Sequence, residues 1–480
     1  MVVRFAVPLL PAAVFAEPAE VEADLAATFL AAAGFVDLVF AVPFAVLAEA
    51  LTTPLVGLRR VVRFFAEEVV LAAIVAQCRA KGITDSNTLH HEVLCHCRMQ
   101  VDHSSPIATV LDRLEVTHFR NLGAQSFAFG PGVHFISGHN GAGKTNVLDA
   151  IYYLCLTRSH FSYGDASAVA HDASWLRLVG SFTLGGKTER IALKMHGRKG
   201  KTLERNGVAY GALAEHIGLL PAVMISPSDI QLVVGGPEER RRYIDQTIAQ
   251  YDPQYLKTLM AYNRLVKSRN ALLKSAAHPL EVDLGLLATY DRQLEQPALR
   301  IVAARRQYVA DLQPVFAQLY AAICDDRELP GLEYATKVGE RPYAELLMAS
   351  RDTDFVLRRT NVGPHRDELS MSLNGEGLRK FASQGQLKTF VLALRLAQAR
   401  LLRDRKLKAP LLLLDDLFDR LDPGRVQRLV NLVLDEGYEQ VFITDTHDER
   451  LAAIEVGDAA AYYHRILAGE LVSPQESVKS

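Results

Sequence analysis

The stretch Gly138-His-Asn-Gly-Ala-Gly-Lys-Thr145 decides the fold class of this chain. It matches G-x4-G-K-[ST], the pattern of the phosphate-binding loop, or P-loop. An apolar run at 133–136 leads into the motif and a helix-like run at 146–155 follows it. This is the strand, loop and helix order that the motif requires. The sequence therefore predicts an α/β fold built around a nucleotide-binding loop.

Each residue type in the motif has a physical role. Gly138, Gly141 and Gly143 allow backbone N–H groups to turn inward around phosphate oxygens. A helix begins at the end of the motif, and its positive dipole end faces the anion. We expect Lys144 to reach the β- and γ-phosphates and Thr145 to supply a hydroxyl to Mg²⁺. The alternative is a glycine-rich turn without function.

Two acidic residues follow a second apolar strand far downstream. The strand is Pro-Leu-Leu-Leu-Leu at 410–414, and Asp415 and Asp416 come directly after it. Asp415 suits the position that holds Mg²⁺. Asp416 stands where a general base for an attacking water would be. The alternative is a solvated strand end that happens to carry two carboxylates.

Three further motifs lie on either side of this acidic pair. Ser383-Gln-Gly-Gln386 precedes a long amphipathic helix, and its serine could be only an N-cap. Between nucleotide-binding motifs it indicates an ABC-type signature, which contacts the γ-phosphate held by a second subunit. The run 417–422 resembles the D-loop of that class. His447, after the strand 440–444, resembles the switch histidine that senses the γ-phosphate, although a surface histidine would look the same.

The spacing of the motifs separates the classes of ATPase. Lys144 and Asp415 are 271 positions apart. This separation is longer than in the compact subunits of transporters and shorter than in SMC proteins, which insert long coiled coils between the two motifs. Helical patterns at 255–275 and 286–323, with a turn near His278-Pro279, predict an antiparallel arm. We therefore expect a P-loop ABC-type ATPase head with a helical insertion domain. The expected parts are an atypical extension at 1–105, a first ATPase lobe at 106–235, the helical arm at 236–345 and a second lobe at 346–475.

Composition sets outer limits. The net charge of −2 with 22% charged residues excludes a histone-like polycation, so any nucleic-acid surface must be local. Five cysteines without the spacing of a disulfide framework indicate reduced thiols in the cytoplasm.

Residues 1–105 are rich in Ala, Val, Leu and Phe, which suggests a mistaken upstream start codon. The alternatives there are a leader at 1–16, a membrane span at 25–48, and a His/Cys metal cluster between His90 and His103. We expect no membrane association.

Two basic patches could meet DNA phosphates. The segment 194–205 holds five basic residues against one acidic residue, among them Arg198, Lys199 and Lys201. The segment 255–275 carries basic residues and no acid, among them Lys267 and Arg269. Such patches favour salt-dependent binding that ignores base sequence. A solvated basic face is the alternative for each.

Several runs together resemble the bacterial RecF family of DNA replication and repair proteins over about residues 111–470. Beside the P-loop, the runs that carry the resemblance are Leu111-Asp-Arg-Leu-Glu-Val-Thr-His-Phe-Arg-Asn121, Ser226-Pro-Ser-Asp229, Gly236-Pro-Glu-Glu-Arg-Arg-Arg242, Thr360-Asn-Val-Gly-Pro-His-Arg-Asp-Glu-Leu369, Ser383-Gln-Gly-Gln-Leu-Lys388 and Leu414-Asp-Asp416. The resemblance implies an SMC-like head that forms an ATP-dependent homodimer and binds single-stranded and duplex DNA at gaps. It also implies work with RecO and RecR in loading the recombinase RecA, and a link to the SOS response.

The resemblance also assigns roles to positions. It implies that the run Asn140 to Thr145 binds ATP, that Asp415 and Asp416 serve Mg²⁺ and water activation, and that Ser383, Gly385 and Gln386 act on the other subunit's nucleotide. Asp416 replaces the Glu of most ABC ATPases, as is common in this family, so we expect weak, DNA-stimulated ATPase activity.

The chain departs from the family pattern at three points. Ala382 stands where Leu opens the usual signature, no Q-loop glutamine is evident, and 1–105 has no counterpart. A transporter ATPase subunit and an SMC-like structural protein are the competing readings, which the basic patches and the short arm disfavour.

Overall fold

The computed structural model describes residues 107–161, 164–197, 200–275, 282–324, 328–406, 408–416 and 423–475. All of them belong to one compact unit, 103–480. Several sequence predictions lie outside the described residues, namely those for the extension 1–105, for Arg198 and Lys199, for the turn near His278-Pro279 and for the D-loop at 417–422. The boundaries that divide the rest of the chain into two lobes and an arm stay predictions.

A six-stranded sheet carries the P-loop. Its strand order is β15-β14-β3-β13-β12-β8, and every neighbouring pair is parallel except β14 and β15. Its strands are β3 (Gly132–Ser137), β8 (Ala222–Ile225), β12 (Leu411–Leu414), β13 (Gln440–Asp445), β14 (Ala461–Leu467) and β15 (Glu470–Gln475). Strands such as β12 are apolar throughout because a parallel sheet is covered on both faces. The predicted α/β fold is confirmed.

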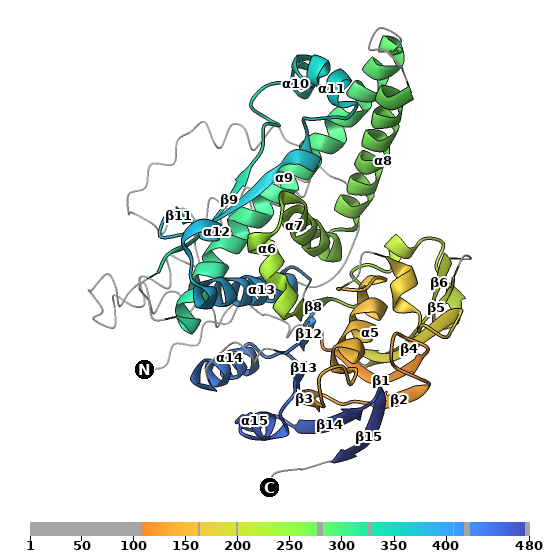
Figure 1. Cartoon of the computed structure of the whole chain (residues 1–480), viewed down its shortest axis with the longest axis vertical. Coiled ribbons are helices and arrows are strands. Elements are labelled where there is room, and N and C mark those ends of the chain that lie inside the picture. Colours follow the sequence, from red (N-terminus) through yellow and green to blue (C-terminus); the bar gives the residue numbers. More distant parts are fainter. Residues whose placement is uncertain are drawn as a thin grey trace, which may run out of the picture. The chain divides into compact units, whose positions relative to one another are not determined.

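A second sheet is antiparallel, and its strands β4 and β5 pack against helix α5 (Lys144–Leu156), which also contacts the parallel sheet (Figure 1). Its order is β2-β1-β4-β5-β6-β7. Its strands are β1 (Thr109–Thr117), β2 (Gln125–Ala128), β4 (Trp175–Leu184), β5 (Lys187–His196), β6 (Gly200–Arg205) and β7 (Val208–Ala209). Asn206 and Gly207 both have positive φ, 52° and 83°, and they form the hairpin turn between β6 and β7.

Helices form most of the remaining structure, with a small sheet of order β11-β10-β9. The helices are α5 (Lys144–Leu156), α6 (Gln231–Val234), α7 (Pro237–Tyr251), α8 (Pro253–Ser275), α9 (Leu284–Ile323), α10 (Tyr343–Ala349), α11 (Arg351–Leu357), α12 (Leu378–Phe381), α13 (Gln384–Lys406), α14 (Pro423–Asp435) and α15 (Asp448–Ala452). The small sheet consists of β9 (Pro330–Ala335), β10 (Glu368–Leu373) and β11 (Glu376–Gly377). Short 3-10 turns include η2 (Leu213–Glu215), η3 (Pro227–Ile230) and η5 (Pro364–Arg366).

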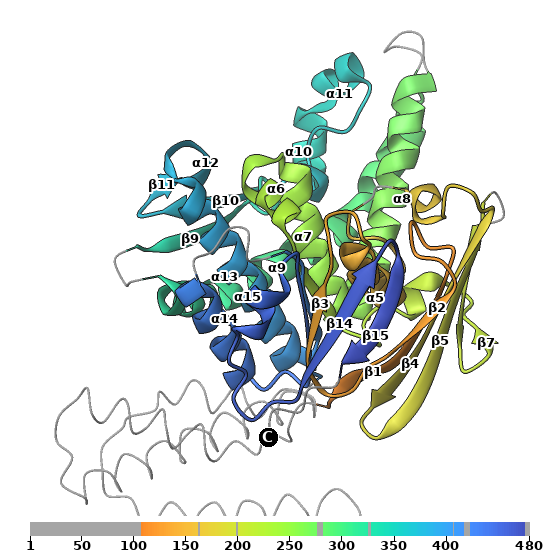
Figure 2. The same cartoon turned by 60° about the horizontal axis from the view of Figure 1, so that its bottom comes forward.

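The helical arm consists of α8 and α9, which run side by side in both views (Figures 1 and 2). Helix α9 has 40 residues and begins at an N-cap, where the Asp283 carboxylate accepts a hydrogen bond from the Leu286 backbone N–H at 2.9 Å. Pro297 and Pro314 lie inside α9. Among the described helices, none has both the length and the apolar character needed to cross a membrane.

Side-chain alternation along the parallel strands builds two cores. Leu411 and Leu413 of β12 join the apolar cluster on the face covered by α5, whereas Leu412 and Leu414 join the cluster on the face covered by α13. Successive residues of a strand point to opposite faces, so one apolar run serves both.

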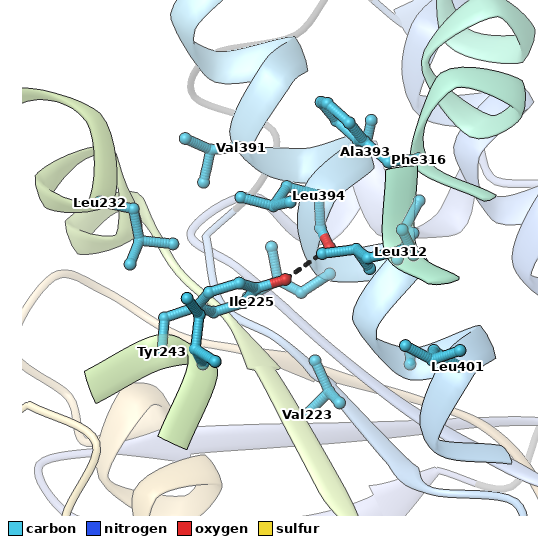
Figure 3. Close-up of a cluster of buried hydrophobic side chains, with 14 of the residues drawn as sticks. Val223, Ile225, Leu232, Tyr243, Leu312, Phe316, Val391, Ala393, Leu394 and Leu401 are labelled. Atoms are coloured by element: carbon cyan, nitrogen blue, oxygen red, sulfur yellow. Dashed lines mark hydrogen bonds between the residues drawn. The ribbon is translucent and has the colours of Figure 1, made fainter. Parts of the chain in front are cut away.

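Figure 3 shows part of the α13 core, where residues of β8, α7, α9 and α13 converge. The Tyr243 hydroxyl donates to the Leu394 carbonyl oxygen there at 3.4 Å. Burying each large apolar side chain contributes about 1.5–3 kcal/mol. The two layers of helix therefore hold the parallel sheet, and with it the P-loop, in place.

A buried ion-pair cluster ties the arm together. The Arg269 guanidinium, 0% exposed, donates to Asp291 at 2.8 Å and to Asp354 at 2.7 Å. It also donates to the Thr360 hydroxyl at 3.0 Å. Burial leaves no part of this guanidinium for a DNA phosphate. Arg269 is therefore removed from the candidate DNA-binding residues, and its role is to hold α8, α9 and α11 together.

We expect Arg269→Ala to lower the free energy of unfolding by about 3–5 kcal/mol, because the buried Asp354 carboxylate would lose its cation and Asp291 would keep only Arg351, at 3.6 Å. Chemical denaturation followed by circular dichroism measures this change. Lys267→Ala is the matched control, because Lys267 is exposed on the same helix and its loss should change stability by less than about 0.5 kcal/mol. Equal stability of the two variants would contradict the structural role of Arg269.

Candidate nucleotide site

The site lies at the carboxyl edge of the parallel sheet. The P-loop follows β3, Asp415 follows β12, and Thr446 and His447 follow β13. Because β3, β13 and β12 are adjacent and parallel, their carboxyl ends meet at one edge. Ligands of open α/β sheets bind in the crevice outside this edge. The topology thus brings the P-loop, the acidic pair and the candidate switch histidine together.

Glycine is required at two P-loop positions. Gly138 has φ 150°, and a Cβ there would overlap the carbonyl oxygen of Ile466. Gly143 has φ 116°, and a Cβ there would lie 3.0 Å from Leu122 Cδ2. Gly143 is the N-cap of α5 and makes no side-chain cap, so the first backbone N–H groups of the helix can point toward an anion. Asn140 and Gly141 are exposed at the crest of the loop.

Lys144 begins α5 and folds back over the loop. Its ammonium donates to the Gly138 carbonyl oxygen at 2.6 Å and to the His139 carbonyl oxygen at 3.2 Å. The side chain is buried, with 7% exposed. This conformation keeps the charge inside the loop where phosphate oxygens would bind.

Asp415 is fixed by two hydroxyl groups. The Thr145 Oγ1 hydroxyl lies 2.9 Å and 3.1 Å from the two carboxylate oxygens of Asp415. The Thr444 hydroxyl donates to Asp415 at 2.8 Å. Burial raises the pKa of Asp415, the two hydroxyl donors lower it, and the neighbouring Asp416 carboxylate raises it again. A hydroxyl and a carboxylate side by side are oxygen ligands of the kind that Mg²⁺ prefers, so these residues fit a magnesium ion.

Asp416 has a special backbone conformation. Its φ of 48° lies in the left-handed region, which is uncommon for a residue other than glycine. Its backbone N–H donates to Thr444 Oγ1 at 2.9 Å. Thr444 therefore accepts from Asp416 and donates to Asp415, which fixes both acids. Sequence reasoning missed Thr444. Its only signal was a polar residue near the carboxyl end of an otherwise apolar strand.

The Phe119-Arg120-Asn121 run makes hydrogen bonds that hold the P-loop and α5 in position. The Asn121 amide donates to the Gly141 carbonyl oxygen at 3.0 Å, and the Asn146 amide donates to Asn121 Oδ1 at 2.6 Å. Arg120 pairs with the buried Asp149 of α5 at 2.7 Å. Sequence reasoning noted this run but gave it no role. The structure assigns it the positioning of the P-loop and of α5.

His447 is exposed and lies next to the P-loop. Its backbone N–H donates to Asp445 Oδ1 at 2.6 Å, which fixes the start of the segment before α15. His447, Gly138 and His139 line a common pocket of about 460 Å³. The structure therefore brings the candidate switch histidine to the first residues of the P-loop.

The signature residues begin α13, which covers the face of the sheet opposite α5. The Ser383 hydroxyl accepts from the Gln386 N–H at 3.2 Å, and Gln386 Oε1 accepts from the Ser383 N–H at 2.7 Å. This reciprocal pair is a capping box, so Ser383 is the N-cap of α13, and its role as a signature residue stays a prediction. Ser383 and Gly385 remain exposed. Among the described residues, no hydrogen bond joins them to the P-loop of the same chain.

The candidate DNA-binding residues have different surroundings. The Lys201 ammonium donates to the Thr157 carbonyl oxygen at 2.7 Å and pairs with Asp165 at 2.8 Å. Lys194, in the same hairpin, pairs with Glu204 at 2.7 Å. Lys267 is exposed on α8. The hairpin is therefore less cationic than its composition suggests, and Lys267 is the exposed candidate of the arm.

Comparison with known proteins agrees with this architecture. The model of the RecF/RecN/SMC N-terminal domain matches residues 110–461. The DNA replication and repair protein RecF of Parabacteroides distasonis is 39% identical over 371 residues, which cover 76% of this chain and 100% of that protein. RecF of Porphyromonas gingivalis is 39% identical over 347 residues, covering 72% of this chain and 94% of that protein.

A solved structure supports the same assignment. It is described as the recombination mediator protein RecF with ATP in the RecFOR pathway, and it superposes with a TM-score of 0.70 at 28% identity. The superposition covers 77% of this chain and 99% of that protein. Fold, site and relatives agree, and the chain belongs to the RecF family of DNA replication and repair proteins.

Proposed function

We propose that this protein is an ATP-dependent DNA-binding protein of recombinational repair and replication that acts as a dimer switch. The observation that carries the proposal is the contact of Thr145 with Asp415, at 2.9 Å and 3.1 Å, which unites the P-loop with the downstream acids. A site of this construction binds a nucleoside triphosphate. The protein then changes its assembly state according to whether the γ-phosphate is present. The relatives are named for DNA replication and repair.

In this proposal Gly138 to Thr145 hold the phosphates of ATP, with Lys144 at the β- and γ-phosphates. Thr145 and Asp415 supply oxygen ligands to Mg²⁺, which neutralises phosphate charge when bound. Asp416 orients and deprotonates the attacking water, and His447 senses the γ-phosphate. The carboxylate of Asp416 is one methylene shorter than glutamate, which favours slow turnover.

A second copy of the chain completes the site. Ser383 and Gly385 lie exposed at the N-terminus of the 23-residue helix α13. The N-terminal dipole of a helix favours a negative charge. ATP held by one P-loop would therefore attract the signature of the other copy, and hydrolysis would release it. The capping box keeps Ser383 and Gln386 in one conformation before that contact forms.

The proposed substrate is gapped DNA with single-stranded and duplex parts, and the proposed partners are RecO and RecR, which together help to load RecA. One structural relative is described as acting in the RecFOR pathway. Because the proposed substrate is chromosomal DNA, we expect the protein to act in the cytoplasm. The transporter alternative is not favoured, because the relatives reported above are repair proteins.

Lys144→Ala should weaken ATP binding by roughly 10- to 100-fold or more, because a charge-assisted hydrogen bond to phosphate is lost. ATP-dependent dimerisation should be lost with it. A fluorescent ATP analogue measures binding and light scattering measures dimerisation. Lys187→Ala, which changes an exposed lysine at the start of β5, is the matched control and should behave as wild type. Unchanged binding in Lys144→Ala would refute the assigned role of this lysine.

Asp416→Asn should reduce ATP turnover by roughly 100-fold or more, because a general base contributes about that much. ATP binding and dimerisation should persist, since the amide keeps the size of the side chain. Single-turnover hydrolysis and light scattering separate the two effects. Hydrolysis at the wild-type rate would show that Asp416 is not the base.

The ATPase rate of the wild-type protein should rise when gapped DNA is added, because DNA binding favours the dimer in which hydrolysis occurs. Steady-state phosphate release with and without gapped DNA measures this. A DNA of the same length without a gap is the control for structure preference. Absence of both DNA binding and stimulation would overturn the proposed function.

A further inference from the structure

A second cavity lies at the far end of α5 from the P-loop. We call it the arginine cleft, and its volume is about 660 Å³. It is lined by the end of α5, by α7, α8 and α9, and by η5. Helix α5 has 13 residues at about 1.5 Å each, so its two ends are about 20 Å apart. Neither Lys144 nor Asp415 lines the cleft, which is therefore separate from the nucleotide site.

The cleft has an excess of positive charge. Five arginines line it, but only two carboxylates do, Glu238 and Asp245. Both carboxylates are already paired, Asp245 with Arg305 at 2.9 Å and Glu238 with Arg242 at 3.4 Å. The other three cationic side chains come from separate elements, namely Arg158 after α5, Arg241 from α7 and Arg366 from η5.

These three arginines have no carboxylate partner within 4.0 Å among the described residues. Arg241 donates to the Asp367 carbonyl oxygen at 2.7 Å, and Arg366 donates to the Thr360 carbonyl oxygen at 3.2 Å. A carbonyl oxygen accepts a hydrogen bond without neutralising the charge. Burial lowers the pKa of Arg241, the nearby Arg305 and Arg366 also lower it, and the Glu368 and Glu238 carboxylates raise it in part. Like charges are thus held together at a cost that a bound anion would offset.

The turn that carries Arg366 is held rigidly. A Cβ on Gly363 would overlap the hydroxyls of Tyr262 and Tyr343, and the φ of 135° also favours glycine. Arg305 donates to the Pro364 carbonyl oxygen at 2.7 Å. The Gly-Pro-His-Arg-Asp run therefore fixes one wall of the cleft.

His365 anchors this turn in its neutral form. Burial lowers the pKa of His365 to about 4, so the ring is neutral at pH 7. Its Nε2 donates to the Thr360 carbonyl oxygen at 3.0 Å, which leaves Nδ1 to accept from the Tyr262 hydroxyl at 2.7 Å. Arg366 is consequently positioned before any ligand arrives, which favours tight binding of an anion.

Apolar side chains also line the cleft. Ile217, Leu256 and Leu259 line it together with the methylene stems of the arginines. A nucleotide combines these two features, because its phosphate can bind the arginines while the face of its base packs against apolar side chains. The volume is that of a small-molecule pocket, so it admits a short stretch of one strand and not a duplex.

We propose that the arginine cleft binds the phosphate backbone of a single DNA strand through Arg158, Arg241 and Arg366. This inference rests on the proposed DNA-binding function and assigns it a site. The cleft would hold the unpaired strand, while exposed cations such as Lys267 contact DNA outside it.

The test measures binding of a fluorescent oligothymidylate to the full chain by anisotropy over a series of salt concentrations. The variant is Arg158→Gln/Arg241→Gln. The control is Arg292→Gln/Arg300→Gln, which removes two exposed arginines of α9 that do not line the cleft. The slope of log affinity against log salt should become less steep by about 1.4 in the cleft variant, since each lost phosphate contact accounts for about 0.7. The control should keep the wild-type slope.

Equal affinity and slope in wild type and cleft variant would overturn the assignment of the cleft while leaving DNA binding intact. Failure of the wild type to bind any DNA would instead overturn the proposed function and the cleft together. An equal loss of affinity for the oligonucleotide and for blunt duplex would also overturn the inference, because a strand-sized cleft discriminates between them.

Two further measurements keep the outcome interpretable. Binding of a fluorescent ATP analogue should match wild type in both double variants, which shows that they fold. If Arg158→Gln/Arg241→Gln does not fold, Arg158→Gln alone is used, because Arg158 is exposed. Thermal stabilisation by inorganic phosphate that is lost in the cleft variant, together with unchanged oligonucleotide binding, would show that the cleft takes free phosphate and would overturn the proposal.

Discussion

The Thr444 hydroxyl holds the carboxyl edge of the parallel sheet together. It donates to Asp415 at 2.8 Å and accepts from the Asp416 N–H at 2.9 Å, while Thr145 contacts the same Asp415 carboxylate from the P-loop side. Thr145 and Asp415 are 270 positions apart in sequence. Their contact requires β3, β13 and β12 to keep one register, because a slip of one residue would turn every side chain of a strand to the other face.

That register is secured by the two helical layers. Helix α5 begins in the P-loop and covers one face, and α13 begins in the signature and covers the other. Each helix therefore begins at a motif of the proposed nucleotide site and contributes its body to the core. The long insertion between β8 and β12 is tolerated because these strands still pair directly, Leu411 with Ala222 through Leu414 with Ile225. The arm is added to the sheet without interrupting it.

Local patterns predicted much of the fold and site. The P-loop and the strand before Asp415 are set by residues close in sequence, so motif spacing and hydrophobic pattern reveal them. Charge was harder to interpret. Arg269 looked like part of a basic helix face, yet it is buried and pairs with Asp354, which lies 85 positions away in sequence. Thr444 was missed for the same reason, since its value arises only when β13 lies beside β12.

The number of basic residues in a segment is therefore a poor guide to anion binding. The number of basic side chains around a cavity that have no carboxylate partner is a better guide. The hairpin 194–205 is rich in lysine and arginine, but Lys194, Lys201 and Arg205 all pair with carboxylates. The arginine cleft draws its cations from α7, η5 and the end of α5, which no local window of sequence unites. A net charge of −2 is compatible with DNA binding because most charges cancel within the fold, and the remainder is concentrated by topology.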